Sequence, residues 1–142
     1  MTSTGRFLAL RLTPGDDLVA GLRRAFLQAR VDAGAVVACT GSLSRVRLRF
    51  AGRDAAEDLE GPFEILSLSG TLDPSHQHLH LSLGDSEGRV TGGHLVAGGA
   101  EVRTTVEAVL LLLPDYRFDR APCTSSGFAE LVVGPSAQAE RP

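Results

Sequence analysis

The chain has 142 residues, the size of a single domain, and this is enough to bury a core without disulfides or structural metals. Hydrophobic residues make up 43% of the chain and charged residues 22%, which is typical of globular rather than disordered proteins. The formal net charge of −3 argues against direct binding of nucleic-acid phosphates by the surface of this domain, because domains that bind them usually carry an excess of basic residues.

We expect neither a secretory signal nor a membrane span in this sequence. No long apolar segment follows basic residues near the N-terminus, and no apolar run reaches the length of a membrane span. Cys39 and Cys123 lie far apart and match no zinc or redox spacing, so we expect both thiols to be free. These features predict a cytoplasmic protein without a membrane partner.

The first elements are a short strand and one long helix. Residues 6–12 alternate weakly between apolar and polar side chains, which predicts a strand. Thr13 is a competent N-cap and precedes Pro14, a residue favoured at the first helical position. An apolar stripe at spacings of three and four then runs from Leu18 to Ala29, so we expect a helix that stops at Gly34.

The remainder of the chain has the patterns of strands and turns. We expect strands over 35–39, 43–50, 63–70, 77–83, 89–96, 101–113 and 128–133, a break at 40–42, a loop or helical turn over 51–60, and irregular structure over 118–124. Most connections are too short for helical crossovers, so the strands should pair antiparallel. The predicted fold class is α+β: a largely antiparallel sheet of about seven strands with one long helix. A single domain should cover residues 1–134, followed by a flexible tail over 135–142.

All four histidines fall within one short stretch, at positions 76, 78, 80 and 94. Alternate residues of a strand share a face, so His78 and His80 should point the same way. His76 follows Pro74 and Ser75 and is predicted to be a turn residue.

The position of His94 depends on the hairpin that joins its strand to the strand of His80. With a three-residue loop over 86–88, Asp85 faces Arg89, and counting back places His80 opposite His94. A two-residue loop, or a bulge at the glycines 92–93, would move His94 to the other face.

Three converging imidazoles with an open position would suit zinc or another first-row divalent metal. His78, His80 and His94 are therefore the candidate metal ligands. The alternative is a row of partly exposed polar side chains opposite an apolar row of leucines, and spacing alone leaves both interpretations open.

Two other patterns are weaker candidates for chemistry. Arg45, Arg47 and Arg49 alternate with apolar residues, which favours the polar face of a half-buried strand over a phosphate site. Arg103, Thr105 and Glu107 also share a face, and we favour a buried or inter-subunit salt bridge with a hydroxyl partner over an anion-binding arginine oriented by a carboxylate. No nucleophile elbow, phosphate loop or dinucleotide fingerprint occurs in the sequence.

Several segments resemble one known family. They are Gly61-Pro62-Phe63-Glu64-Ile65-Leu66-Ser67-Leu68-Ser69-Gly70, His78-Leu79-His80-Leu81-Ser82-Leu83, Asp85 with Gly88, Gly92-Gly93-His94-Leu95 and Val102-Arg103-Thr104-Thr105-Val106-Glu107. Their order and spacing are similar to those of the PPC (plant and prokaryote conserved) domain family, from the first helix to about Val133.

The resemblance implies an α+β domain that assembles as a homotrimer, with a metal site near the subunit interface at His78, His80 and His94. Plant members carry AT-hooks that bind AT-rich DNA, but this sequence has no Arg-Gly-Arg-Pro-like core, so we do not expect autonomous DNA binding. The interpretations, in order of preference, are a trimeric assembly module that recruits other proteins without catalysis, a metal-dependent enzyme, and a DNA-associated regulator.

Overall fold

The computed structural model describes residues 2–137. Its elements in chain order are β1 (Arg6–Leu12), α1 (Leu18–Gln28), β2 (Gly34–Arg49), β3 (Glu57–Leu72), β4 (Gln77–Gly84), β5 (Val90–Leu95), β6 (Glu101–Leu112), β7 (Tyr116–Pro122) and β8 (Ala129–Pro135). One helix and a predominantly antiparallel set of strands confirm the α+β class, with eight strands where about seven were expected. Within the described residues, no helix is long and apolar enough to cross a membrane.

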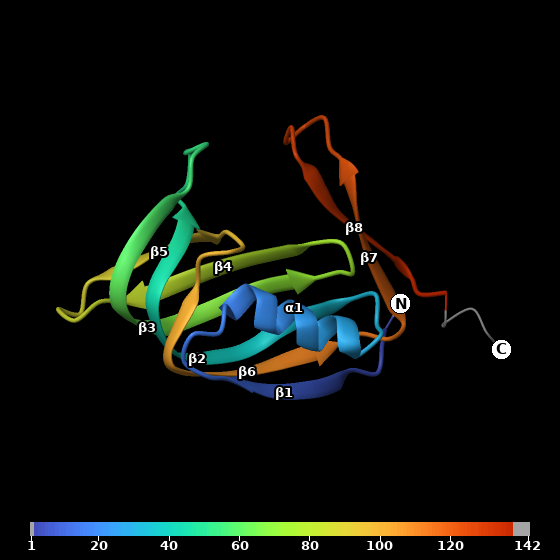
Figure 1. Ribbon diagram of the computed structural model, residues 1–142. Helices are drawn as coiled ribbons and strands as arrows, with labels where there is room; N and C mark the ends of the chain where they lie inside the picture. Colours follow the sequence, from blue (N-terminus) through green and yellow to red (C-terminus); the bar gives the residue numbers. More distant parts are fainter. Residues whose placement is uncertain (1, 138–142) are drawn as a thin grey trace.

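Six strands form one antiparallel sheet in the order β1-β6-β2-β3-β4-β5. The sheet curls, because the edge strand β5 also pairs with the end of β2, through Leu48 with Leu95 and Arg49 with His94. Strands β7 and β8 form a separate two-stranded hairpin, which projects from the same side as the β2–β3 connection (Figure 1).

The core lies between helix α1 and the sheet. Leu18, Leu22 and Phe26 of the helix are fully buried, and they pack in one cluster with sheet residues that include Leu110 and Leu83. The apolar stripe predicted the buried face of the helix, because side chains at spacings of three and four share one side.

The helix begins later than the sequence predicted. Asp17, not Thr13, is the N-cap: its carboxylate accepts a hydrogen bond from the Ala20 amide at 2.9 Å and a second from the Ala100 amide at 3.2 Å. Thr13 instead donates to Asp16 in a turn. The predicted stop at Gly34 was also wrong, since the helix ends at Gln28 and Gly34 begins β2.

Three of the segments predicted to be irregular are wholly or partly strand. Residues 34–49 form a single strand in which register shifts replace the expected break at 40–42. The expected loop over 51–60 ends at Glu57, where β3 starts. The segment over 118–124, predicted to be irregular, is mostly β7.

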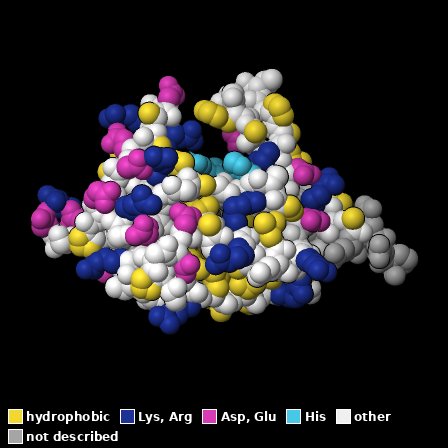
Figure 2. All heavy atoms as spheres, in the orientation of Figure 1, with side chains coloured by type: hydrophobic (Ala, Val, Ile, Leu, Met, Phe, Trp, Pro, Cys, Tyr) yellow, Lys and Arg dark blue, Asp and Glu magenta, His cyan; other side chains and the backbone are white. Residues whose placement is uncertain are grey.

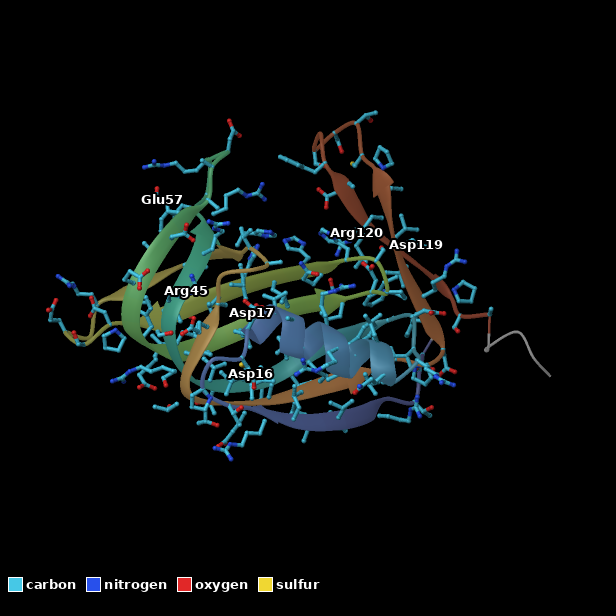
Figure 3. All side chains as sticks on the ribbon, in the orientation of Figure 1. Asp16, Asp17, Arg45, Glu57, Asp119 and Arg120 are labelled. Carbon is cyan, nitrogen blue, oxygen red and sulfur yellow. The ribbon has the colours of Figure 1, made fainter. Side chains whose placement is uncertain are left out.

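The β7–β8 hairpin is fixed to the sheet at its base. Phe118 is buried and its amide donates to the Asp32 carbonyl at 3.1 Å. Arg120 lies 3.6 Å from the buried carboxylate of Asp73 and donates to the Thr71 hydroxyl at 3.3 Å (Figure 3). β8 includes Gly134 and Pro135, so the predicted domain boundary falls inside a strand, and residues 138–142 of the predicted tail lie outside the described part of the chain.

Candidate metal centre

Strand β4 carries two of the candidate ligands on one face. Leu79 and Leu81 are buried in the core, so His78 and His80 point to the opposite side of the sheet. His76 lies before the strand, in a turn where its amide donates to the Asp73 carboxylate at 2.6 Å. The structure therefore confirms that His76 is a turn residue.

The β4–β5 hairpin places the third ligand. The amide of Asp85 donates to the Arg89 carbonyl at 3.0 Å, and Asp85 also accepts hydrogen bonds from the amides of Glu87 and Arg89. This closes the three-residue loop, and His80 lies directly opposite His94. Of the hairpin registers that the sequence left open, the structure has the one with a three-residue loop, which brings the histidines together.

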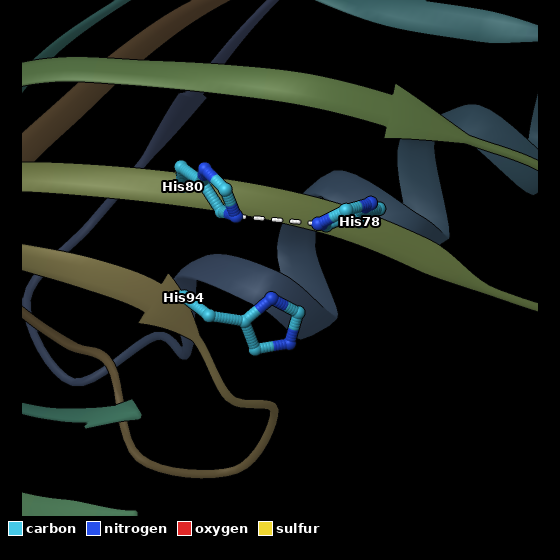
Figure 4. A group of neighbouring side chains, drawn as sticks. All are labelled: His78, His80 and His94. Carbon is cyan, nitrogen blue, oxygen red and sulfur yellow. Dashed lines mark hydrogen bonds between the residues drawn. The ribbon is translucent and has the colours of Figure 1, made fainter. Parts of the chain in front are cut away.

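The three rings form a compact cluster (Figure 4). Their centroids lie 5.0 Å apart for His78 and His80, 5.3 Å for His78 and His94, and 5.8 Å for His80 and His94. The Nε2 atoms of His78 and His80 are 3.2 Å apart, and one ring nitrogen of each of the three histidines lies within 4.8 Å of the others. Two nitrogen ligands of a tetrahedral zinc ion are separated by about 3.3 Å, so small side-chain rotations would complete the set.

The surroundings lower the pKa of two of these imidazoles. Burial lowers the pKa of His78, and electrostatic repulsion by the neighbouring His80 and Arg120 lowers it further, against a smaller opposite effect of Glu130. Burial and the charge of Arg49 likewise lower the pKa of His94. A metal ion binds the unprotonated imidazole, so these shifts favour metal binding at neutral pH.

The donor set fits a first-row divalent ion. Three neutral imidazole nitrogens are typical ligands of zinc and related metals, and they leave at least one coordination position open. Among the described residues, these three histidines form the one group of potential ligands with metal-binding separations.

The open side of the cluster faces a groove of about 730 Å³, which we call the histidine groove. One wall comes from the end of β2 at Arg49 and from the β2–β3 connection, including Phe50 and Arg53, and the other from Phe128 at the tip of the β7–β8 hairpin. Figure 2 shows the histidines at the bottom of a hollow between two projections. Sequence patterns did not reveal this groove, because its two walls are more than 70 residues apart in the chain.

The other candidate residues have different roles. Arg45 and Arg47 form ion pairs with Glu101 and Asp58, which supports their interpretation as the polar face of a strand. In the group on β6, Thr105 accepts a hydrogen bond from Arg11, and no ion pair joins Arg103 to Glu107 in the described residues. Arg103 and Glu107 are both exposed, so the predicted buried salt bridge is wrong, whereas an inter-subunit salt bridge stays a prediction.

Comparisons with known proteins agree with this fold. Over 128 residues the chain is 44% identical to the bifunctional protein GlmU of Synechococcus sp. strain JA-2-3B'a(2-13), covering 90% of this chain but only 20% of that protein. The chain thus spans about a fifth of the length of that curated relative.

Solved structures match over nearly the whole chain. A hypothetical protein from Salmonella enterica has 44% identity and a TM-score of 0.91, with 95% of this chain and 97% of that chain covered. A metal-containing protein from Archaeoglobus fulgidus has 28% identity and a TM-score of 0.77, with 89% and 93% covered. The family model of the Plants and Prokaryotes Conserved (PCC) domain matches residues 1–114. This is the family that the sequence motifs resemble, and the chain belongs to it.

Proposed function

We propose that this protein is a homotrimeric PCC-domain module that holds a divalent first-row metal, with zinc as the leading candidate, on His78, His80 and His94. The observation that carries the metal assignment is the convergence of three imidazole nitrogens within 4.8 Å at the floor of a groove. The metal-containing relative from Archaeoglobus fulgidus supports the same assignment.

The apolar surface of the β7–β8 hairpin supports the assembly. Leu131, Val132 and Val133 are 36%, 45% and 53% exposed on β8, so both faces of this two-stranded sheet present apolar side chains. An isolated hairpin cannot bury such residues by itself, whereas symmetric copies of the chain can cover them. The family resemblance makes a trimer the expected symmetry.

A catalytic role is the second candidate, because the metal site opens on the histidine groove. A divalent ion held by three imidazoles supplies Lewis acidity to a ligand at its open position. The residues of this chain would hold the ion and shape the groove, and the metal-binding module remains the preferred interpretation.

Zinc titration of metal-free protein by calorimetry tests the proposal. We expect one zinc ion per chain, and we expect His78→Ala and His94→Ala each to weaken binding at least tenfold, because each removes one of three ligands. His76→Ala is the matched control and should bind zinc like the wild type, because His76 lies in the preceding turn. Equal zinc affinity in all four proteins would contradict the proposed centre.

A further inference from the structure

The outer face of β2 carries three arginines, and two of them already have carboxylate partners. The Nε atom of Arg45 lies 3.2 Å from Glu101, and Arg47 makes two hydrogen bonds to Asp58, at 2.8 and 2.7 Å. Arg49 continues the same row, but no ion pair or side-chain hydrogen bond engages it among the described residues. Its guanidinium is therefore available to a ligand.

Arg49 stands beside the metal centre. It pairs with His94 across strands β2 and β5, and it lines the histidine groove together with the three histidines. A divalent ion on the histidines would thus place two further positive charges next to an unpaired guanidinium.

The positive charges at this site would outnumber the carboxylates near them. Imidazole ligands carry no negative charge, and among the described residues Asp54, exposed in the β2–β3 connection, is the carboxylate that lines the groove, while Glu130 on β8 lines an adjoining pocket with His78 and His80. Arg53 lies in the same connection and pairs with Glu57 at 3.6 Å. A partly desolvated dication beside a guanidinium is unfavourable without a counter-ion, so an anion from solution is the natural complement.

We propose that the histidine groove binds a small organic anion, whose carboxylate or phosphate group occupies the open metal position and pairs with Arg49. The planar guanidinium matches both groups through two parallel hydrogen bonds. Phe50 and Phe128 line the groove and offer apolar surface to the body of the ligand. A volume of about 730 Å³ lies within the range of small-molecule sites and exceeds what an inorganic ion alone needs. This inference rests on the proposed metal centre.

The test uses full-length protein loaded with Co²⁺, whose visible absorption responds to a change of ligand. Phenylphosphate and benzoate serve as probes, and phenol is the neutral control. We expect saturable spectral changes with at least one of the two anions and none with phenol. The anion that binds more tightly identifies the preferred group.

Two arginine variants distinguish the effect on anion binding from the effect on metal binding. Arg49→Gln should raise the dissociation constant of the anion about tenfold or more, because it removes a charge-assisted hydrogen-bond pair. Arg45→Gln lies on the same face of the same strand and should leave that constant unchanged, because Arg45 pairs with Glu101. Cobalt affinity should be preserved in both variants, which also shows that they fold.

The possible failures are distinct. If Co²⁺ binds but neither anion alters its spectrum, or if Arg49→Gln binds the anion like the wild type, the anion site is wrong and the metal centre stands. If Co²⁺ and zinc do not bind to the wild-type protein, the metal centre and the anion site both fall.

Discussion

The imidazoles of His78 and His94 link the candidate site to the stability of the metal-free protein. Burial lowers the pKa of both groups below the ordinary value of 6.5. At a pH between the pKa of the folded state and that of the unfolded state, the unfolded chain binds more protons than the folded protein. Lowering the pH through this range therefore favours unfolding. The stabilising contribution is complete above about pH 6.5 and is lost as the pH falls through the lower folded values.

We therefore expect the urea midpoint of the metal-free protein to fall between about pH 7.5 and pH 5.5. Most carboxylates remain ionised over this range, so the decrease reports on the histidines and on the Cys123 thiol, whose pKa is lowered to about 7 and which the variant below retains. In the double variant His78→Gln, His94→Gln the decrease should be smaller. A variant whose midpoint falls as steeply as that of the wild type would show that these two groups do not cause it.

The two cysteines have opposite reactivity. A hydrogen bond from the Ser125 hydroxyl, 3.0 Å from the Cys123 sulfur, is the main cause that lowers the pKa of this thiol to about 7. Burial raises the pKa of Cys39 to about 11. The thiolate is the reactive form, so iodoacetamide at pH 7 should modify Cys123 first.

Mass spectrometry of the alkylated protein over time measures this difference. Ser125→Ala should slow the modification of Cys123 several-fold at pH 7, because it removes the main stabilisation of the thiolate. Faster modification of Cys39 than of Cys123 would contradict the assigned environments.

At the scale of elements, strands β3 and β4 approach closely beside the metal site. Gly70 has a φ of 143°, and an added Cβ would overlap the carbonyl oxygen of His78. Gly41 on β2 has a similar φ of 139° and a similar overlap with the Thr105 carbonyl, away from the histidines. The two glycines therefore have the same backbone constraint, but only Gly70 lies beside the histidines, so Gly41 serves as its control.

Alanine at either position should lower the free energy of unfolding by about 2 kcal/mol or more, because backbone strain and overpacking combine. Only Gly70→Ala should also weaken zinc binding, since it displaces the backbone of His78. Urea denaturation and zinc titration of both variants check this. Equal zinc affinity in the two variants would show that the β3–β4 contact does not position the site.

Elements that are set by neighbouring residues could be predicted from the sequence, whereas elements that depend on distant contacts could not. The β4–β5 hairpin depends on Asp85, Gly88 and alternation in adjacent strands, so counting residues across the turn correctly placed His80 opposite His94. The start of α1 was misplaced because Asp17 caps the helix while it also accepts a hydrogen bond from Ala100, which is 83 residues away. Local propensity contains no information about such a contact.

Strand β7 and the histidine groove show the same limit. Polar residues and Pro122 make β7 resemble a loop, and it is held in place by Phe118 and by Arg120 beside the distant Asp73. The unpaired state of Arg49 likewise depends on where Glu101 and Asp58 lie after folding. Residue spacing predicted the ligands, but only the tertiary structure shows the groove above them.

At the scale of the whole molecule, the exposed apolar residues of β8 determine the expected assembly. Sedimentation of the wild-type protein at micromolar concentration should give a trimer, and Val133→Asp should dissociate it by placing a charge in the apolar interface. Val90→Asp is the control, because Val90 is also exposed but lies at the start of β5, at the opposite end of the molecule from β8 (Figure 1). A monomeric wild type would contradict the proposed assembly.

The most direct test of the central claim is anomalous X-ray diffraction at the zinc absorption edge, from crystals of zinc-loaded protein. The proposed centre predicts one strong peak per chain, about 2.0–2.1 Å from a ring nitrogen of each of His78, His80 and His94. Absence of a peak among these histidines, or a peak that contacts only one of them, would contradict the assignment of a three-histidine metal site.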